Sequence, residues 1–317
     1  MALPALPRLV DRLTVVSVKS KSALPDATVA VPRIQLGLYK MSGREARESV
    51  KEALAVGYRG FDCAQMYYNE REAGLAIKNF LAGPQNTQGL RREDIFYTSK
   101  LAENGTSYDA VKRSIAQSVE ACGLGYIDLF LLHSPYGGKK ARLTSWKALE
   151  DAVLEGKVRS AGVSNYGVAH IEELMKAVEA SDSGVKPVIN QIEVHPFNTQ
   201  TGIRDTCKKH GIEIEAYAPL VAGMRMRHPK IASLAKKYEC SPAQLLVGWS
   251  LQHGMVTLPK TSRSQRLIEN ADVSSLKISE EDMNELDALD ERLVTDCHAV
   301  NIHAGSKGMR NEDLSEK

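Results

Sequence analysis

The chain has 317 residues, of which 43% are hydrophobic and 25% are charged, so it can bury a large core. Its 41 basic and 39 acidic residues give a net charge of +2, and no basic block is interleaved with aromatic residues. This balance argues against a nucleic-acid-binding protein. The sequence contains no apolar run of about eighteen residues, so no membrane span is predicted. The five cysteines lack CxxC or zinc spacing, which indicates reduced thiols in a cytoplasmic protein.

Short β-branched or aromatic runs alternate with longer segments of helical period, which predicts eight strand–helix units. The predicted strands are RIQLGLY (33–39), YRGFD (58–62), DIFYTSK (94–100), IDLFLL (127–132), VRSAGVS (158–164), PVINQIEV (187–194), GIEIEAYA (211–218) and MVTLP (255–259). The predicted helices cover about 43–56, 70–82, 107–122, 144–155, 168–180, 200–210, 228–238, 241–253, 264–271 and 280–291.

These units predict a single-domain (β/α)8 barrel, also called a TIM barrel. The strands are continuously apolar, as parallel strands covered on both faces must be. Glycines between a helix and the next strand mark helix C-termini, at Gly57, Gly125, Gly156 and Gly211. The alternative is an open doubly wound sheet, which would be expected to carry GxGxxG after an early strand. That motif does not occur, so the barrel is favoured.

Both ends of the chain are predicted to lie outside the barrel. Residues 1–30 form an N-terminal extension, 31–295 the barrel with its extra C-terminal helix, and 296–317 a polar C-terminal loop or tail. The extension is basic and poor in acids, as transit peptides are, but Pro4 and Pro7 interrupt any early helix.

Polar residues at the ends of the predicted strands indicate where the chemistry takes place. In a barrel of this kind the site is built at the C-terminal ends of the strands, so these side chains should meet at one mouth. They are Asp62, Lys100, His133, Ser164, Asn165, Gln191, Tyr217 and Lys260. The sequence contains no evident nucleophile beside a base and no set of metal ligands. We therefore expect a reaction site that uses no metal.

Tyr67, in the loop after Asp62, completes a group suited to proton delivery. A phenol is a weak acid at neutral pH, and a neighbouring ammonium such as Lys100 makes its proton easier to donate. A neutral His133 could hold the same carbonyl oxygen. Taken singly, Asp62 reads more readily as a helix cap, Lys100 as a solvated cation and His133 as a core histidine. Their occurrence at consecutive strand ends favours the catalytic interpretation.

The sequence around these residues resembles the aldo-keto reductases. The matching segments are GYRGFDCAQMYYNEREAG, FYTSKL, YIDLFLLHSP, GKVRSAGVSNY, NQIEVHP, YAPL and LPKTSRSQRLIEN, and they appear in the family's order from about residue 33 to 295. The resemblance implies an NADP-dependent oxidoreductase that reduces an aldehyde or ketone to an alcohol.

The resemblance also implies roles for the matching positions. Tyr67 is the proton donor, Lys100 its activating neighbour, Asp62 the partner of Lys100, and His133 orients the carbonyl. Ser164, Asn165 and Gln191 hold the nicotinamide carboxamide. Tyr217 stacks on the nicotinamide ring, and Leu220 lies along the pyrophosphate. Tyr68 is the bystander of the tyrosine pair, at the pocket wall.

The segment PKTSRSQRLIEN carries the prediction of NADPH rather than NADH. Lys260, Thr261, Ser262 and Arg266 place two cations and two hydroxyls within seven residues, which suits the adenosine 2′-phosphate. The alternative is a helix N-terminus with solvated cations. Glu269 and Asn270 resemble the family's adenine contacts.

The sequence also departs from the family pattern. His133-Ser134-Pro135 stands where many relatives have His-Trp-Pro, and Leu38 stands where a hydroxyl residue is common. The short loop YGGKKARLT that follows His133-Ser134-Pro135 predicts a lower, more open pocket wall. Candidate substrate contacts are Tyr39, His133 and Tyr136, with Cys297 and His298 of the tail as further wall residues.

Three functions remain in competition at this point. The leading one is carbonyl reduction with NADPH, by a monomer or weak homo-oligomer whose partner is a small carbonyl or alcohol. The second is a cofactor-binding regulatory subunit with little turnover, which would not need an intact Tyr67, Lys100 and His133. The third is a lyase or isomerase that uses Lys100 as a Schiff-base amine, which would require an unpaired lysine.

Overall fold

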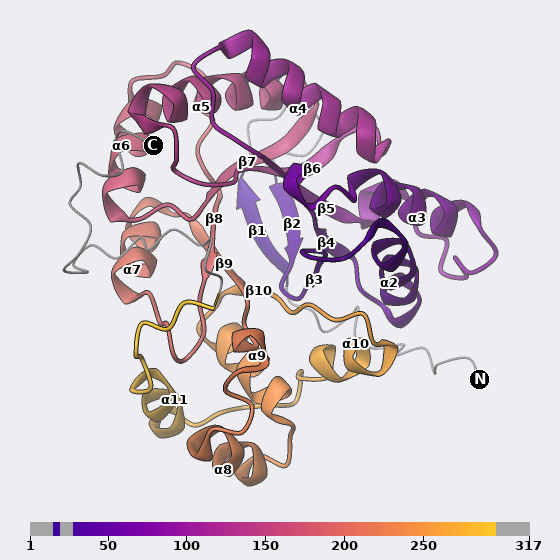
Figure 1. Cartoon of the computed structure of the whole chain (residues 1–317), viewed down its shortest axis with the longest axis vertical. Helices are drawn as coiled ribbons and strands as arrows, with labels where there is room; N and C mark the ends of the chain where they lie inside the picture. The colour runs from indigo at the N-terminus through magenta and orange to yellow at the C-terminus, as the bar shows by residue number, and fades with distance from the viewer. Residues whose placement is uncertain (1–14, 20–27, 296–317) are drawn as a thin grey trace.

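A computed structural model describes residues 15–19 and 28–295 of the chain. Its centre is an eight-stranded parallel sheet in sequential order (Figure 1). The strands are β3 (Leu36–Gly37), β4 (Gly60–Asp62), β5 (Phe96–Leu101), β6 (Ile127–Leu132), β7 (Val158–Ser164), β8 (Ile189–Glu193), β9 (Glu213–Tyr217) and β10 (Val256–Leu258). A parallel bridge between Ile34 and Thr257 joins the segment just before β3 to β10, where Gln35 N donates to Thr257 O at 3.0 Å. The predicted (β/α)8 barrel is confirmed.

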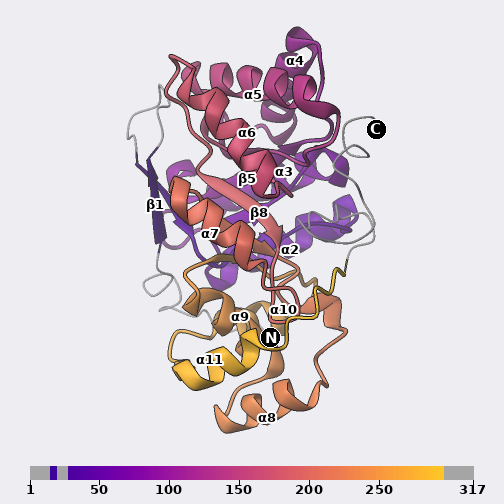
Figure 2. The same cartoon turned by 90° about the vertical axis from the view of Figure 1, so that its left-hand side faces the viewer.

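The helices follow the strands and cover the outside of the barrel (Figures 1 and 2). They are α2 (Gly43–Val56), α3 (Glu70–Ala82), α4 (Tyr108–Cys122), α5 (Gly138–Leu154), α6 (Val168–Glu179), α7 (Thr201–His210), α8 (Pro229–Lys237), α9 (Pro242–Gln252), α10 (Ser264–Ala271) and α11 (Glu280–Asp287). Each contributes apolar side chains to the hydrophobic core, and α8 packs on α9 while α11 packs on α8. No helix among the described residues is both long and apolar enough to cross a membrane.

Two helices differ from the prediction because tertiary contacts set their ends. Helix α5 starts at Gly138 rather than near 144. Most of YGGKKARLT is therefore helical, and the loop before α5 is shorter than predicted. Arg142 explains the early start, because its guanidinium donates to Pro135 O at 2.8 Å and pairs with Glu173 at 2.9 Å. Helix α11 ends at Asp287 rather than 291. The chain beyond it turns toward the β8 loop, where Glu291 N and Leu293 N donate to Phe197 O.

An antiparallel hairpin that the sequence pattern did not predict covers one end of the barrel. It pairs β1 (Val15–Lys19) with β2 (Thr28–Pro32) (Figure 1). Val29 and Val31 of β2 are buried in a cluster with Phe96, Leu129, Leu131, Val188, Ile189 and Val256. Several of these residues lie at the beginnings of β5, β8 and β10, so the hairpin closes the N-terminal end of the barrel. The polar strand ends therefore meet at the opposite end.

Candidate active site

Asp62 and Lys100 form a buried ion pair inside the barrel mouth. Asp62 ends β4 and pairs with Thr98 of the neighbouring β5. Lys100 lies two residues beyond Thr98 and so points to the same face of the sheet. Lys100 Nζ lies 2.7 and 2.8 Å from the two Asp62 carboxylate oxygens and donates to Cys63 O at 2.8 Å. Both residues are at most 3% exposed. A buried ammonium requires such a partner, because an unpaired charge loses its hydration without compensation.

A short 3-10 helix, Gln65–Tyr67, carries the phenol to this pair. Gln65 fixes the helix from one side: its amide donates to Ser114 O and Ser118 Oγ, and its oxygen accepts from Ala102 N at 2.8 Å. Asn69 fixes the other side, where its amide donates to Leu38 O and Met41 O. The position of Tyr67 is therefore set by hydrogen bonds to three neighbouring elements.

Tyr67 and Tyr68 have different surroundings. Lys100 Nζ lies 3.0 Å from Tyr67 Oη. The Tyr39 ring packs 5.1 Å from the Tyr67 ring, and the His133 ring meets it edge-on at 5.8 Å and 74°. Tyr68 adopts a left-handed backbone with φ of 55° and is 89% exposed. The structure thus brings Tyr67, but not Tyr68, to the ion pair.

His133 follows β6 and is a neutral imidazole at physiological pH. Burial, together with the positive charge of Lys100, lowers the pKa of His133 to about 3. Asn165 donates to the His133 carbonyl at 3.0 Å and fixes the backbone there. A neutral ring can donate one hydrogen bond without adding a second cation beside Lys100. Tyr136, further along the same loop, is 44% exposed, and its carbonyl accepts from Asn104.

The residues predicted to bind the nicotinamide lie together on β7, β8 and β9. Ser164 and Tyr217 end β7 and β9, Asn165 follows β7, and Gln191 lies two residues before the end of β8. Ser164 Oγ donates to Gln191 O at 2.9 Å, and Tyr217 Oη donates to Asn165 Oδ1 at 2.9 Å. Asn165 has φ of 60°, a left-handed conformation that asparagine tolerates better than most residues. Gln191 Nε2 donates to Asp62 Oδ1 at 2.8 Å, which links this group directly to the ion pair.

Sequence reasoning missed the buried carboxyl group of Glu215, on β9. It accepts from Gln191 Nε2 at 2.7 Å and from Gln35 Nε2 at 2.9 Å. Burial and the nearby Asp62 charge raise the pKa of Glu215 to about 8. Strand parity could have found it: side chains two residues apart point to the same face, and Tyr217 was already assigned to the mouth.

The segment after β10 places the predicted phosphate-binding residues together before α10. Lys260, Ser262 and Arg266 are exposed, whereas Thr261 is buried and its Oγ1 accepts from Arg263 N at 3.1 Å. Asn270 is 2% exposed, and its Nδ2 has no hydrogen-bond partner among the described residues. Glu269 and Leu220 are partly buried. Cys297 and His298 lie outside the described residues.

Comparison with known families agrees with this geometry. The model of the aldo/keto reductase family matches residues 33–291. The chain belongs to the aldo/keto reductase family. An uncharacterized oxidoreductase of Schizosaccharomyces pombe is 46% identical over 82% of this chain and 90% of the relative. The glyoxal reductase of Bacillus subtilis is 41% identical over 84% of this chain and 92% of the relative. A solved structure of a Bombyx mori aldo-keto reductase in complex with NADP superposes with a TM-score of 0.76 at 30% identity, covering 88% of this chain and 95% of that one.

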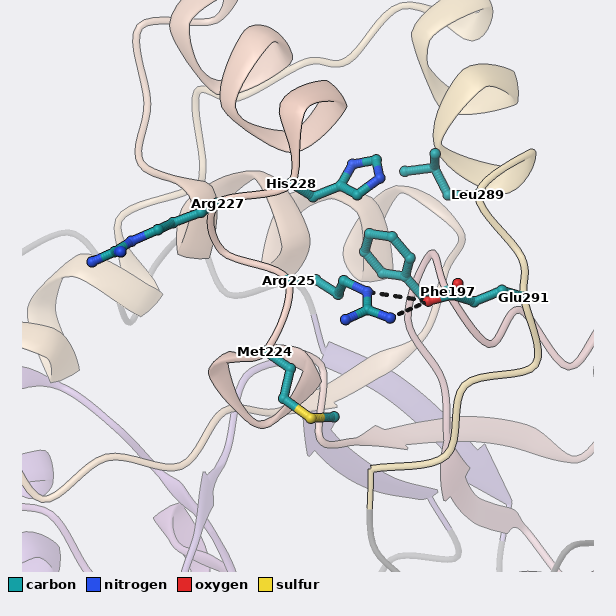
Figure 3. Close-up of a pocket in the computed structure, with 7 residues that line it drawn as sticks. All are labelled: Phe197, Met224, Arg225, Arg227, His228, Leu289 and Glu291. Atoms are coloured by element: carbon teal, nitrogen blue, oxygen red, sulfur yellow. Dashed lines mark hydrogen bonds and ion pairs between the residues drawn. The ribbon is translucent and has the colours of Figure 1, made fainter.

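This aldo/keto reductase also has a cavity of about 430 Å³ beside the loop that follows β9 (Figure 3). Its wall contains Phe197, Met224, Arg225, Arg227, His228, Leu289 and Glu291. Arg225 binds Glu291 at 2.7 and 3.1 Å and lies 5.6 Å from the Phe197 ring centroid. The ion pair ties the β9 loop to the chain after α11. The cavity is lined by none of the residues predicted for catalysis.

Proposed function

We propose that this aldo/keto reductase reduces an aldehyde or ketone with NADPH and that Tyr67 donates the proton. The observation that supports this most directly is the contact of Tyr67 Oη with Lys100 Nζ at 3.0 Å, beside His133 and with Asp62 behind the lysine. This arrangement contains one acid, one neutral hydrogen-bond donor and one buried cation. Such a set suits proton delivery to an oxygen that gains negative charge.

Each residue has a defined part in the proposed reaction. His133 donates a hydrogen bond to the substrate carbonyl and holds it near Tyr67. As the carbonyl carbon gains a hydride, its oxygen becomes an alkoxide and takes the proton from Tyr67 Oη. The resulting phenolate is stabilised by the Lys100 ammonium, whose charge is balanced by Asp62. Lys100 is thus a fixed cation rather than a nucleophile, and its pairing with Asp62 argues against a Schiff-base mechanism.

The protein is an enzyme of the NADP-dependent aldo/keto reductase type, and the bound nicotinamide supplies the hydride. We propose that Ser164, Asn165 and Gln191 hold its carboxamide and that Tyr217 stacks on the ring. The partnerless Asn270 Nδ2 suits the adenine. Leu220 would lie along the pyrophosphate and Glu269 near the adenine. The exposed cations of the segment after β10, with Thr261 and Ser262, suit the 2′-phosphate.

We propose that the substrate is a small carbonyl compound with Tyr39 and Tyr136 as contacts. Tyr39 packs against Tyr67, and Tyr136 is exposed on the His133 loop. Ser134 leaves room that a tryptophan would fill. The relative named glyoxal reductase makes α-dicarbonyls the first compounds to test.

The proposed proton donor is tested by Tyr67→Phe with Tyr68→Phe as the matched control. Purified variants are mixed with NADPH and a panel of α-dicarbonyls, aldehydes, sugars and ketones, and cofactor oxidation is followed. Loss of the Tyr67 hydroxyl should lower kcat by at least about 100-fold. Tyr68→Phe should stay within about twofold, because that side chain is 89% exposed. Equal activity in the two variants would refute the assignment. No turnover by the wild type on any substrate, despite NADPH binding, would favour the regulatory-subunit alternative.

The 2′-phosphate assignment is tested by Arg266→Ala. This change should weaken NADPH binding by about tenfold or more and leave NADH binding within about twofold, because only NADPH carries the phosphate. Arg113→Ala, on the exposed face of α4, removes the same charge far from α10 and serves as the control (Figure 1). Equal losses for the two cofactors would overturn the assignment.

A further inference from the structure

A line of five polar side chains crosses the barrel interior below the mouth. Lys100 contacts Asp62, Gln191 Nε2 reaches both Asp62 Oδ1 and Glu215 Oε2, and Gln35 Nε2 reaches Glu215 Oε1. Gln35 and Glu215 are fully buried, and Gln191 is 2% exposed. They come from β4, β5, β8, β9 and the residue just before β3, so the line links opposite sides of the barrel.

The local sequence makes space for this line. A Cβ atom at Gly60 would lie 2.4 Å from Gln35 Cγ and 2.9 Å from Gln35 Cδ. Gly60 therefore leaves the space that the Gln35 side chain occupies inside the barrel. A buried carboxyl group is costly unless hydrogen-bonded, and here each Glu215 oxygen has an amide partner.

The bonds to Gln191 fix which way its amide faces. Its nitrogen has two hydrogens, and the two carboxyl groups accept both. These two bonds turn the Gln191 side-chain oxygen away from both carboxyl groups. The opposite orientation would bring that oxygen against two carboxyl groups. The oxygen is therefore the part of the amide left to accept a hydrogen bond from a ligand.

We propose that Glu215 is a positioning residue that orients the Gln191 amide so that its oxygen accepts from the nicotinamide carboxamide. This inference rests on the proposed function, since it assigns Gln191 to the cofactor. Glu215 touches neither substrate nor cofactor and acts through Gln191. Without it, one of the two constraints on the Gln191 nitrogen is lost, and the amide is free to rotate.

The charges around Glu215 are compatible with this role at neutral pH. The charged groups that face it are Asp62 on β4 and Lys100 on β5, while Gln35, just before β3, and Gln191 on β8 are neutral. Its raised pKa, about 8, keeps Glu215 protonated, so Asp62 is the single carboxylate opposite Lys100. A protonated acid still accepts from Gln191 through its carbonyl oxygen. Glutamine at 215 should reproduce that neutral acceptor.

The inference is tested by binding measurements with two ligands. Isothermal titration of Glu215→Leu should give an NADPH dissociation constant raised by about tenfold. Binding of 2′-phospho-ADP-ribose, which lacks the nicotinamide, should stay within about twofold and shows that the variant is folded. Glu215→Gln should bind both ligands like the wild type. Thr257→Val is the control, because this buried hydroxyl on the adjacent strand has no partner among the described residues.

A double-mutant cycle separates positioning from general damage to the barrel. In a Gln191→Leu background, Glu215→Leu should add no further loss of NADPH affinity, because the intermediary is gone. Additive losses, equal weakening of both ligands, or no effect of Glu215→Leu would each overturn the inference. Failure of the wild type to bind NADPH would instead refute the proposed function itself.

Discussion

His133 shows how one side chain is tuned by its neighbours. An imidazole in water gains a proton near pH 6.5, where it would become a second cation beside Lys100. Burial and the Lys100 charge lower the pKa of His133 to about 3, so the ring stays neutral through the physiological range. It can therefore donate a hydrogen bond to a carbonyl but cannot serve as the proton source. This supports the proposal that Tyr67 is the acid.

We predict that kcat for carbonyl reduction shows no imidazole titration between pH 5 and 7. His133→Gln keeps a neutral donor with poorer geometry, so we expect kcat to fall by about tenfold with an unchanged pH profile. The measurement is kcat against pH for both proteins under saturating NADPH. A limb near pH 6.5 in the wild type that disappears in the variant would contradict a neutral His133.

At the scale of elements, the 3-10 helix Gln65–Tyr67 determines the position of Tyr67 Oη relative to Lys100 Nζ. Tyr67 lies between the end of β4 and the start of α3, on a segment too short to hold itself. Gln65 connects this segment to α4 through Ser114 and Ser118, and to the end of β5 through Ala102. The outer helix layer thus takes part in positioning a residue at the mouth.

We predict that Gln65→Leu lowers kcat by between about tenfold and a hundredfold while the NADPH dissociation constant stays within about twofold. The reason is that a small displacement of Tyr67 Oη from Lys100 Nζ weakens proton transfer without touching the cofactor residues. Met66→Leu, on the same short helix with a side chain 52% exposed, is the control. A Gln65→Leu enzyme with normal kcat would show that the helix needs no such support.

Three helices have the bounds that the sequence predicted. The predicted ranges 43–56, 70–82 and 264–271 agree with α2, α3 and α10. Helix α2 begins with a capping box between Ser42 and Glu45, a signal that needs no tertiary contact. Helix α5 has no side-chain cap at its start, and Arg142 stabilises it through a residue on α6. A start of that kind is invisible to local pattern.

The hairpin was missed for a similar reason. VVSVK and TVAVP are β-branched, but their pairing is supported by the burial of Val29 and Val31 against the barrel end. That surface exists only after the barrel has formed. The proximity of the predicted site residues was easier to predict, because barrel topology alone places strand ends together, and the roles of these residues stay predictions. Glu215 and Gln35 were missed because they lie below the strand ends, inside runs that read as apolar.

At the scale of the whole molecule, the two ends of the barrel differ in chemistry. The hairpin and an apolar cluster close the N-terminal end. Toward the other end, the interior becomes a connected set of amides, carboxyls and one ammonium. Closing one end keeps water from reaching the ion pair from below. The free-energy cost of burying Glu215 should then lower the free energy of unfolding of the whole domain.

We predict that the free energy of unfolding of the wild type falls between pH 5.5 and 7.5 relative to Glu215→Gln. The pKa of Glu215 rises from 4.5 to about 8 on folding, mainly through burial and secondarily through Asp62. Between these values the unfolded chain releases the proton while the folded protein keeps it. Rising pH therefore favours the unfolded state, by roughly 1.4 kcal/mol per pH unit.

Urea unfolding of both proteins at several pH values measures this difference directly. Glutamine keeps the hydrogen bond from Gln191 but cannot ionise. The extra fall in the free energy of unfolding with rising pH should therefore appear only in the wild type. Other titrating groups are common to both proteins and cancel in the comparison. Parallel dependences of the two free energies on pH would mean that Glu215 is already ionised in the folded barrel. In that case Lys100 would face two carboxylates instead of one.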